Sequence, residues 1–164
     1  MPILDSHTLE FFSRSPEQTR RLGMRLGAFL QVSDCVCLTG DLGSGKTTLV
    51  QGISQGWGSL DPVSSPTFVL VNQYRRPTGE SLYHMDAYRI TNALEAEDLD
   101  LDLMLGQGAL VIEWAERILP ALPRERLVIQ MRWVADEQRG MVLTPYGERY
   151  KSLLDAIRQR MIGV

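Results

Sequence analysis

The order of apolar and polar positions predicts a chain in which helices alternate with short strands. Leu22, Leu26 and Leu30 recur at helical spacing, whereas Cys35 to Leu38 form a continuous apolar run, which is typical of a buried strand. Helices are predicted over about residues 16–30, 46–55 and 147–162. Strands are predicted over about residues 34–39, 67–75, 80–86, 109–112, 127–133 and 141–144.

Residues that cap or interrupt helices mark several of these boundaries. Ser15 and Gln18 have the spacing of a capping box, and Pro16 occupies the first helical position, where its missing N–H costs nothing. Gly56 is expected to end the second helix. Residues 93–105 fit no single period, because leucines and acidic residues alternate there while the flanks favour helix. We expect one or two short helices in that segment.

The turn-forming residues Arg76-Pro77-Thr78-Gly79 separate two strands and predict a hairpin. Hairpin strands run antiparallel, whereas strands separated by a helix usually run parallel in the same sheet. The sequence therefore predicts an α/β fold with a mixed β-sheet flanked by helices. A length of 164 residues corresponds to a single domain, residues 1–164.

The overall composition is that of an ordinary globular protein, with 44% hydrophobic and 23% charged residues. The net charge of −3 disfavours direct, independent nucleic-acid binding, because proteins of that kind usually carry a strong basic excess. No apolar run reaches the roughly 18 residues of a membrane span, and the N-terminus lacks the features of a signal peptide. Cys35 and Cys37 are interpreted as reduced, buried thiols, so we expect a cytoplasmic protein.

Residues 40–47, Gly-Asp-Leu-Gly-Ser-Gly-Lys-Thr, match the phosphate-binding loop (P-loop) pattern G-x-x-x-x-G-K-[ST] between a predicted strand and a predicted helix. Glycines let successive N–H groups turn inward around an anion, and the helix adds the positive end of its dipole. Lys46 would reach the β- and γ-phosphates, and Thr47 would offer its hydroxyl to Mg²⁺. The motif therefore predicts a nucleoside triphosphate site.

Three polar residues are expected to meet this loop at one edge of the sheet. Asp86 and Glu113 follow apolar strands, and the hairpin register places Thr67 near the end of the Asp86 strand. Ligands bind at the carboxyl edge of such sheets, so these side chains can position Mg²⁺, water or a mobile switch. Alternatively, Thr67 only begins a strand and Asp86 only caps the next segment. His84 is interpreted as a structural histidine.

The positions of the two lysines exclude one way of recognising guanine. Many GTPases read the base with an Asn-Lys-x-Asp element, but Lys46 follows Gly45 and Lys151 follows Tyr150. That element is therefore absent, and ATP is the expected nucleotide. Glu113 is a single acid where many motor ATPases have an Asp-Glu pair, which favours a slow, switch-like or partner-dependent hydrolase.

Four motifs occur in series with the order and spacing of one protein family. They are Gly40 to Leu49 (GDLGSGKTTL), Ser65 to Phe68 (SPTF), Tyr83 to Arg89 (YHMDAYR) and Ile112 to Trp114 (IEW). Through these motifs the chain, over about residues 15–133, resembles the TsaE (YjeE-like) P-loop ATPases. Met85 and Ala87 replace bulkier apolar residues of the family pattern, which affects local packing and not the expected role of Asp86.

The resemblance implies a bacterial ATPase needed for the threonylcarbamoyladenosine modification of tRNA. It implies binding of ATP and Mg²⁺, slow hydrolysis stimulated by TsaB-like and TsaD-like partners, and contact with tRNA only through them. The threonylcarbamoyl transfer itself would belong to the partners. The resemblance assigns phosphate binding to Asp41, Gly43, Ser44, Gly45, Lys46, Thr47 and Thr48, Mg²⁺ to Thr47 and Glu113, and hydrolysis or switching to Lys46, Thr67, Asp86 and Glu113.

Two other functions stay open on the sequence alone. A P-loop small-molecule or nucleotide kinase would need an arginine-bearing lid, and no such insertion is obvious. A nucleotide-dependent assembly factor would bind ATP and hardly hydrolyse it.

Trp114 is expected to pack beside Glu113, as a core residue or as a reporter of nucleotide binding. Two interpretations are open for the C-terminal arginines: contact with tRNA or ATP, or scattered surface positions, which we expect by default. They are Arg124, Arg126, Arg132 and Arg139.

Overall fold

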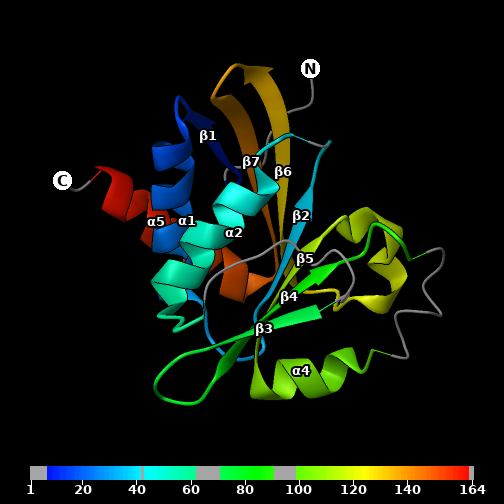
Figure 1. Cartoon of the computed structure of the whole chain (residues 1–164). Helices are drawn as coiled ribbons and strands as arrows, with labels where there is room; N and C mark the ends of the chain where they lie inside the picture. Colours follow the sequence, from blue (N-terminus) through cyan, green and yellow to red (C-terminus); the bar gives the residue numbers. More distant parts are fainter. Residues whose placement is uncertain (1–6, 42, 62–70, 91–98, 163–164) are drawn as a thin grey trace.

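Helices pack on both faces of one mixed sheet in the computed structural model, which describes residues 7–41, 43–61, 71–90 and 99–162 (Figure 1). The described strands lie in the order β1-β7-β6-β2-β5-β4-β3. They are β1 (Leu9–Ser13), β2 (Cys35–Thr39), β3 (Val71–Arg75), β4 (Ser81–Asp86), β5 (Gly108–Glu113), β6 (Arg126–Ala135) and β7 (Gln138–Tyr146). The helices are α1 (Pro16–Phe29), α2 (Lys46–Trp57), α4 (Leu101–Gln107) and α5 (Glu148–Ile162), with short 3-10 helices η1 (Ala115–Arg117) and η2 (Leu119–Ala121). None of the helices in these ranges is long and apolar enough to cross a membrane.

Parallel pairing joins β4, β5, β2 and β6 in the centre of the sheet, whereas β3, β7 and β1 run antiparallel to their neighbours. The predicted mixed sheet is therefore confirmed. The predicted hairpin is confirmed as well, because Val71 of β3 pairs with Met85 of β4. In its turn Gly79 has a φ of 101° and donates its N–H to the carbonyl of Arg76 at 2.9 Å. Parallel pairing brings the carboxyl ends of β2, β4 and β5 to one edge, which is where the site is built.

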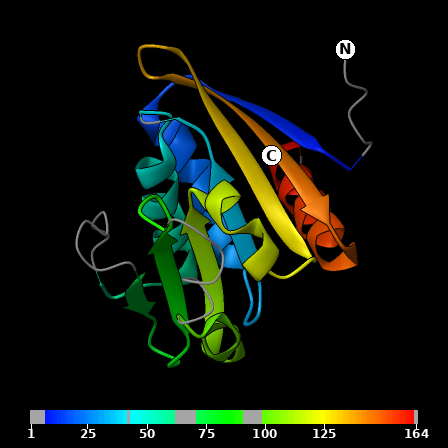
Figure 2. The same cartoon turned by 90° about the vertical axis from the view of Figure 1, so that its right-hand side faces the viewer.

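Side chains that alternate along the central strands enter two separate cores. Val36 and Leu38 of β2 pack with residues of α1, α2 and α5, whereas Cys35 and Cys37 pack with residues of α4 and the 3-10 helices. Both cysteines are buried free thiols, as the sequence predicts. The 90° view in Figure 2 shows β6 and β7 crossing the molecule as a long hairpin, with β1 beside β7. Because apolar layers cover both faces of β2 and β5, the sequences of these two strands are continuous apolar runs.

The observed boundaries differ from the predicted ones in two places. Helix α2 continues through Gly56 and ends before Gly58, whose φ is 91°, so the predicted stop at Gly56 is wrong. The edge strand β1 was not predicted, because only its first and last residues are buried and its apolar pattern does not alternate strictly. In the segment 93–105 the described part contains α4, which begins at Leu101, while residues 91–98 lie outside the described ranges.

Glycines on α1 and α2 let the two helices touch backbone to backbone. A Cβ atom on Gly27 of α1 would lie 2.1 Å from the carbonyl oxygen of Ile53, and one on Gly52 of α2 would lie 2.1 Å from that of Arg20. A Cβ on Gly56 would lie 2.0 Å from the carbonyl oxygen of Met24, which explains why a glycine occurs inside this helix. No side chain fits at these distances, so α2 is fixed against α1 through the backbone itself.

The predicted cap of α1 is also confirmed. Gln18 donates its backbone N–H to Ser15 Oγ at 3.2 Å, and Pro16 occupies the first helical position. The side chain of Gln18 in turn accepts the N–H of Arg14 at 2.8 Å. The N–H of Gln18 is thereby satisfied as in a capping box, whereas the Gln18 side chain accepts the N–H of Arg14 and not that of the N-cap residue Ser15.

Replacing Gly52 with alanine should separate α1 from α2 and destabilise the protein. The added methyl group would collide with the backbone of Arg20, and overpacking of this kind costs typically about 1–3 kcal/mol in the free energy of unfolding. Urea denaturation of the Gly52→Ala variant measures this cost. Gly106→Ala in α4 is the matched control, since no atom lies within 4 Å of the place that its methyl group would take, and it should be neutral or stabilise by up to about 1 kcal/mol. Equal stability of the two variants would contradict the backbone contact.

Candidate functional site

The P-loop lies between the end of β2 and the start of α2, where its sequence motif predicts it. Gly40, Gly43 and Gly45 have φ values of 137°, 79° and 100°, which side-chain-bearing residues rarely adopt. Gly40 also approaches β6 closely, because a Cβ there would lie 2.3 Å from the carbonyl oxygen of Met131. The loop therefore needs glycine for its backbone angles and for its contact with the sheet.

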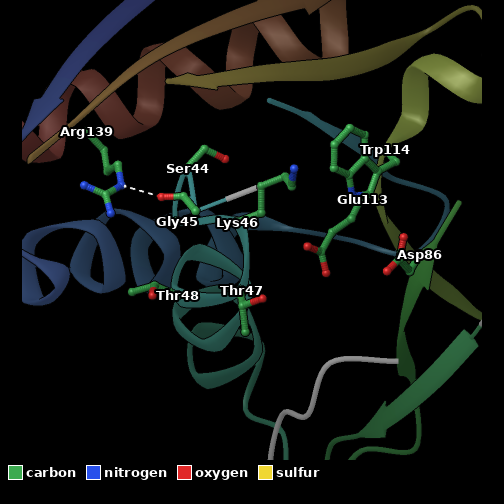
Figure 3. Close-up of a pocket in the computed structure, with 10 residues that line it drawn as sticks. Ser44, Gly45, Lys46, Thr47, Thr48, Asp86, Glu113, Trp114 and Arg139 are labelled. Atoms are coloured by element: carbon green, nitrogen blue, oxygen red, sulfur yellow. Dashed lines mark hydrogen bonds between the residues drawn. The ribbon is translucent and has the colours of Figure 1, made fainter. Parts of the chain in front are cut away.

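The loop and the first turn of α2 form one wall of a pocket of about 470 Å³ (Figure 3). The first backbone hydrogen bond of α2 runs from Leu49 N to Gly45 O at 3.0 Å, and the preceding N–H groups have no acceptor within the helix. Ser44 is 1% exposed, and its Oγ has no hydrogen-bond partner in the described part of the chain. A buried hydroxyl without a partner and a helix N-terminus both fit an anion with several oxygens, such as a polyphosphate.

Lys46 is a cation of this pocket and is almost completely buried, at 6% exposure. Its Nζ donates to the carbonyl of Gly40 and, at 3.3 Å, to that of Asp41, and it lies 3.9 Å from the centre of the Trp114 ring. Burial lowers the pKa of Lys46 below its usual value, and nearby carboxylates, Glu113 first among them, oppose that shift. A bound polyanion would oppose it further, so the buried ammonium group is suited to a negatively charged ligand.

The acids Asp86 and Glu113 arrive at the pocket from the ends of β4 and β5. They are direct neighbours in the parallel ladder, and Ala87 donates its N–H to the carbonyl of Glu113 at 2.9 Å. Glu113 is 6% exposed, whereas Asp86 is half-buried and accepts the N–H of Tyr88 at 2.9 Å through Oδ1. Asp86 therefore both caps the following segment and lines the pocket, so the two interpretations of this residue are compatible.

The donor set suits Mg²⁺ better than a metal held by protein side chains alone. No group of three or more His, Cys, Asp or Glu side chains within the described ranges is arranged to hold a metal ion. Mg²⁺ usually keeps several waters and takes one or two protein oxygens together with phosphate oxygens of the substrate. Thr47 and Glu113 both line the pocket and carry oxygen atoms of the required kind.

Trp114 closes the pocket on the side of the acids. Its φ is 60°, a strained value for a large side chain directly after Glu113. The ring lies between Lys46 and Tyr88, with 4.9 Å between its centre and that of the Tyr88 ring. This contact with the P-loop lysine makes the indole a direct neighbour of any ligand in the pocket, and the aromatic stack holds it in place.

Arg139 of β7 also lines the pocket, although the sequence interpretation favoured a scattered surface position over contact with tRNA or ATP. Its Nε donates to the carbonyl of Gly43 at 3.0 Å (Figure 3). Its Nη1 donates to the carbonyls of Ala135 and Gln138 at 3.0 and 2.9 Å. The guanidinium group thus fastens the P-loop to the β6–β7 hairpin. That interpretation is wrong for Arg139.

The structure brings most of the predicted site residues together. The pocket lining contains Gly43, Ser44, Gly45, Lys46, Thr47, Thr48, Asp86 and Glu113. Asp41 contributes its backbone, because its carbonyl accepts the N–H of Ser44 at 3.1 Å as well as the Lys46 ammonium group. Thr67 lies outside the described residues.

The sequence interpretation missed one contact of the site. Buried His84 forms a hydrogen bond with Glu113. The sequence interpretation treated this histidine as a structural residue with no partner. The sequence did contain one indication of this contact. His84 lies two residues before Asp86, and alternate residues of a strand share a face.

The sheet order, the covering helices and the glycine loop define a P-loop-type α/β protein. The sequence profile of the family described as "Threonylcarbamoyl adenosine biosynthesis protein TsaE" matches residues 13–141, and the chain belongs to this family. The resemblance drawn from the four sequence motifs is thereby confirmed.

Curated relatives and a solved structure agree with this assignment. A protein of Bacillus subtilis (strain 168) is 39% identical over 150 residues, covering 91% of this chain and 93% of the relative. One of Streptomyces coelicolor is 43% identical over 137 residues, covering 80% and 93%. Both are named tRNA threonylcarbamoyladenosine biosynthesis protein TsaE. The crystal structure of Bacillus subtilis YdiB superposes with a TM-score of 0.78 at 33% identity, covering 94% of this chain and 96% of that one.

Removing the Arg139 side chain should loosen the P-loop and weaken phosphate binding. A hydrogen bond contributes about 0.5–1.5 kcal/mol, so loss of the contact with Gly43 should lower the affinity for ATP about 2- to 10-fold in Arg139→Ala. Isothermal titration calorimetry measures this affinity. Arg132→Ala, on the same hairpin but packed over Gly140, should bind like the unmodified protein. An unchanged affinity in Arg139→Ala would show that the loop does not need this contact.

Proposed function

We propose that the protein binds ATP with Mg²⁺ in this pocket and hydrolyses it slowly, as an accessory protein of tRNA threonylcarbamoyladenosine formation. Its partners would be a TsaB-like and a TsaD-like protein, and tRNA would be bound through them. The partner-dependent ATPase cycle would act on that complex, and the threonylcarbamoyl transfer would take place on the partners. Membership of the TsaE family supports the pathway, and the pocket supports the nucleotide.

The observation that carries the ATPase proposal is the meeting of the P-loop with two strand-end acids in one pocket. The N–H groups of the P-loop and α2, together with Lys46, would hold the phosphates. Thr47 and Glu113 would hold or orient Mg²⁺, which when bound neutralises charge on the β- and γ-phosphates. Asp86, which is paired with Glu113, would orient the attacking water or switch with the nucleotide state. Thr67 would share this role.

The proposed reaction needs only water and ATP. The oxygen of water bonds to the γ-phosphorus, and the bond from that phosphorus to the β–γ bridging oxygen breaks. ADP and inorganic phosphate leave, and the proton of the water passes to solvent or to a phosphate oxygen.

The pocket holds one buried lysine and one acid from each of two strands, which is consistent with slow turnover in the absence of a partner.

A kinase has less support from the pocket. Phosphoryl transfer to a second substrate usually employs arginines that clamp the transferred group. Within the described ranges the one arginine lining the pocket is Arg139, and its guanidinium group is bound to backbone carbonyls. Incubation with labelled ATP and candidate acceptors separates the two functions, because a kinase forms a phosphorylated metabolite and an ATPase releases free phosphate.

Threonylcarbamoylation of tRNA in a reconstituted system should require this protein for repeated turnover. Lys46→Ala should not support that turnover, because hydrogen bonds to charged groups contribute about 1.5–3 kcal/mol and ATP affinity should fall about 10- to 100-fold. The measurement is modified tRNA per partner complex over time, with Lys151→Ala as the control that removes the other lysine. Unchanged multiple-turnover modification when the protein is omitted would refute the proposed function.

Glu113→Gln should separate ATP binding from hydrolysis. The amide keeps the size of the side chain but removes the negative charge, so phosphate release should fall roughly 100-fold while ATP affinity changes less than about 3-fold. Phosphate release and titration calorimetry give the two numbers, and Glu125→Gln, an exposed acid, serves as the control.

The same variant tests the alternative of an assembly factor. If Glu113→Gln still supports full tRNA modification without hydrolysis, the protein works by nucleotide binding alone, and the ATPase part of the proposal is wrong. Loss of both hydrolysis and repeated modification supports the ATPase cycle.

A further inference from the structure

A completely buried imidazole links an edge strand of the sheet to the acid of the pocket. His84 of β4 is 0% exposed, and both of its ring nitrogens lie within hydrogen-bond distance of a neighbour. Nδ1 is 3.0 Å from the hydroxyl of Tyr74 on β3, and Nε2 is 2.5 Å from Oε2 of Glu113 on β5. Three adjacent strands therefore contribute one side chain each to a single chain of hydrogen bonds.

The sheet register explains why these side chains meet. Along β4, His84 and Asp86 point to the same face, which is the face covered by α2. Glu113 is paired with Asp86 and lies diagonally across from His84, while Tyr74 is paired with Leu82, two positions before His84 on the same face. Diagonal neighbours on one face lie within reach of long or aromatic side chains.

The carboxylate fixes the direction of the bond between His84 and Glu113, and the tautomer of the ring fixes the direction of the bond to Tyr74. A carboxylate can only accept, so the Nε2–H of His84 donates to Glu113. In the neutral ring Nδ1 then accepts, and the hydroxyl of Tyr74 donates to it. Tyr74 is itself 2% exposed, and the side-chain amide of Asn72 donates to its oxygen at 3.5 Å. The order of donors runs from the edge of the sheet toward the pocket.

The contact leaves one oxygen of Glu113 for the ligand. Oε2 is held by His84, whereas Oε1 makes no hydrogen bond within the part of the chain that the structure describes. The carboxylate itself lines the pocket, on the side facing Thr47 (Figure 3). A glutamate side chain has three rotatable bonds, and an external hydrogen bond restricts them before any ligand arrives.

We propose that His84 is the positioning residue of this site: its Nε2–H fixes the Glu113 carboxylate so that Oε1 faces the bound nucleotide, and Tyr74 fixes the ring. The inference rests on the proposed ATPase function and deepens it. His84 is completely buried and is not among the residues that line the pocket, so its loss should change turnover more than nucleotide affinity. Removing such supporting partners typically costs about 10- to 100-fold in activity.

A pair of conservative variants isolates the Nε2 contact. In His84→Gln the side-chain amide nitrogen replaces Nε2 and can still donate to Glu113. In His84→Asn the amide nitrogen replaces Nδ1, so it can contact Tyr74 but cannot reach Glu113. We expect kcat for ATP hydrolysis to fall about 10- to 100-fold in His84→Asn and less than about 5-fold in His84→Gln. The dissociation constant for ATP, measured by calorimetry, should change less than about 3-fold in both.

A third variant and a spectroscopic measurement guard against effects of misfolding. Tyr74→Phe removes one hydroxyl without changing the shape of the ring, and it should lower kcat only a few-fold. The chain has two histidines, His7 and His84, so the imidazole N–H signals in proton–nitrogen NMR spectra are simple to assign. A slowly exchanging Nε2–H signal of His84 should be present in the unmodified protein and should shift in Glu113→Gln.

The outcomes separate this inference from the proposed function. Turnover of folded, ATP-binding His84→Asn at the unmodified rate would overturn the positioning role, and so would equal losses of kcat in the asparagine and glutamine variants. Absence of ATP hydrolysis in the unmodified protein, alone and with its partners, would instead overturn the proposed function. In that case the NMR signal and its response to Glu113→Gln still decide whether His84 holds Glu113.

Discussion

The register of the parallel strands is the constraint on which the site depends. Asp86 pairs with Glu113 and Glu113 with Leu38, so the acids and the strand leading into the P-loop end at the same level of the sheet. Side chains alternate between faces, and a shift of one residue would move Glu113 and its neighbours into the opposite core. That core is filled by apolar residues such as Leu110 and Ile112, so the shift would also bury charge among them. Core packing and site geometry are therefore enforced by the same pairing.

The two buried charges of the pocket, Lys46 and Glu113, are oriented by other groups and not by each other. Lys46 and Glu113 are each 6% exposed, yet in the described part of the chain they form no salt bridge with each other. Lys46 is held by loop carbonyls and an indole face, and Glu113 by an imidazole. A direct ion pair would have to be broken before a phosphate or a metal ion could bind, whereas these contacts leave both charges available.

The sequence predicts those parts of the site that local chemistry determines. Lys46 and Thr47 belong to a contiguous motif, and Asp86 and Glu113 follow from the rule that parallel strands end at one edge. Arg139 could not be predicted, because its contact with Gly43 depends on the length and direction of the β6–β7 hairpin. The Tyr74, His84 and Glu113 contact depends on side-chain reach across three strands, which alternation alone does not give. The end of α2 was misjudged because a glycine needed for packing resembles a glycine that ends a helix.

The pairing of β1 with β7 has a consequence for how the protein folds during synthesis. Leu9 pairs with Leu143, so β1 cannot complete its pairing until the ribosome has also made the β6–β7 hairpin. Helices α1 and α2 and the β3–β4 hairpin depend on closer neighbours and can form earlier. Because Arg139 belongs to β7, its hydrogen bond to Gly43 of the P-loop can form only in that last stage. Nascent chains that stop short of the hairpin would carry the phosphate-binding motif without the support that holds it in shape.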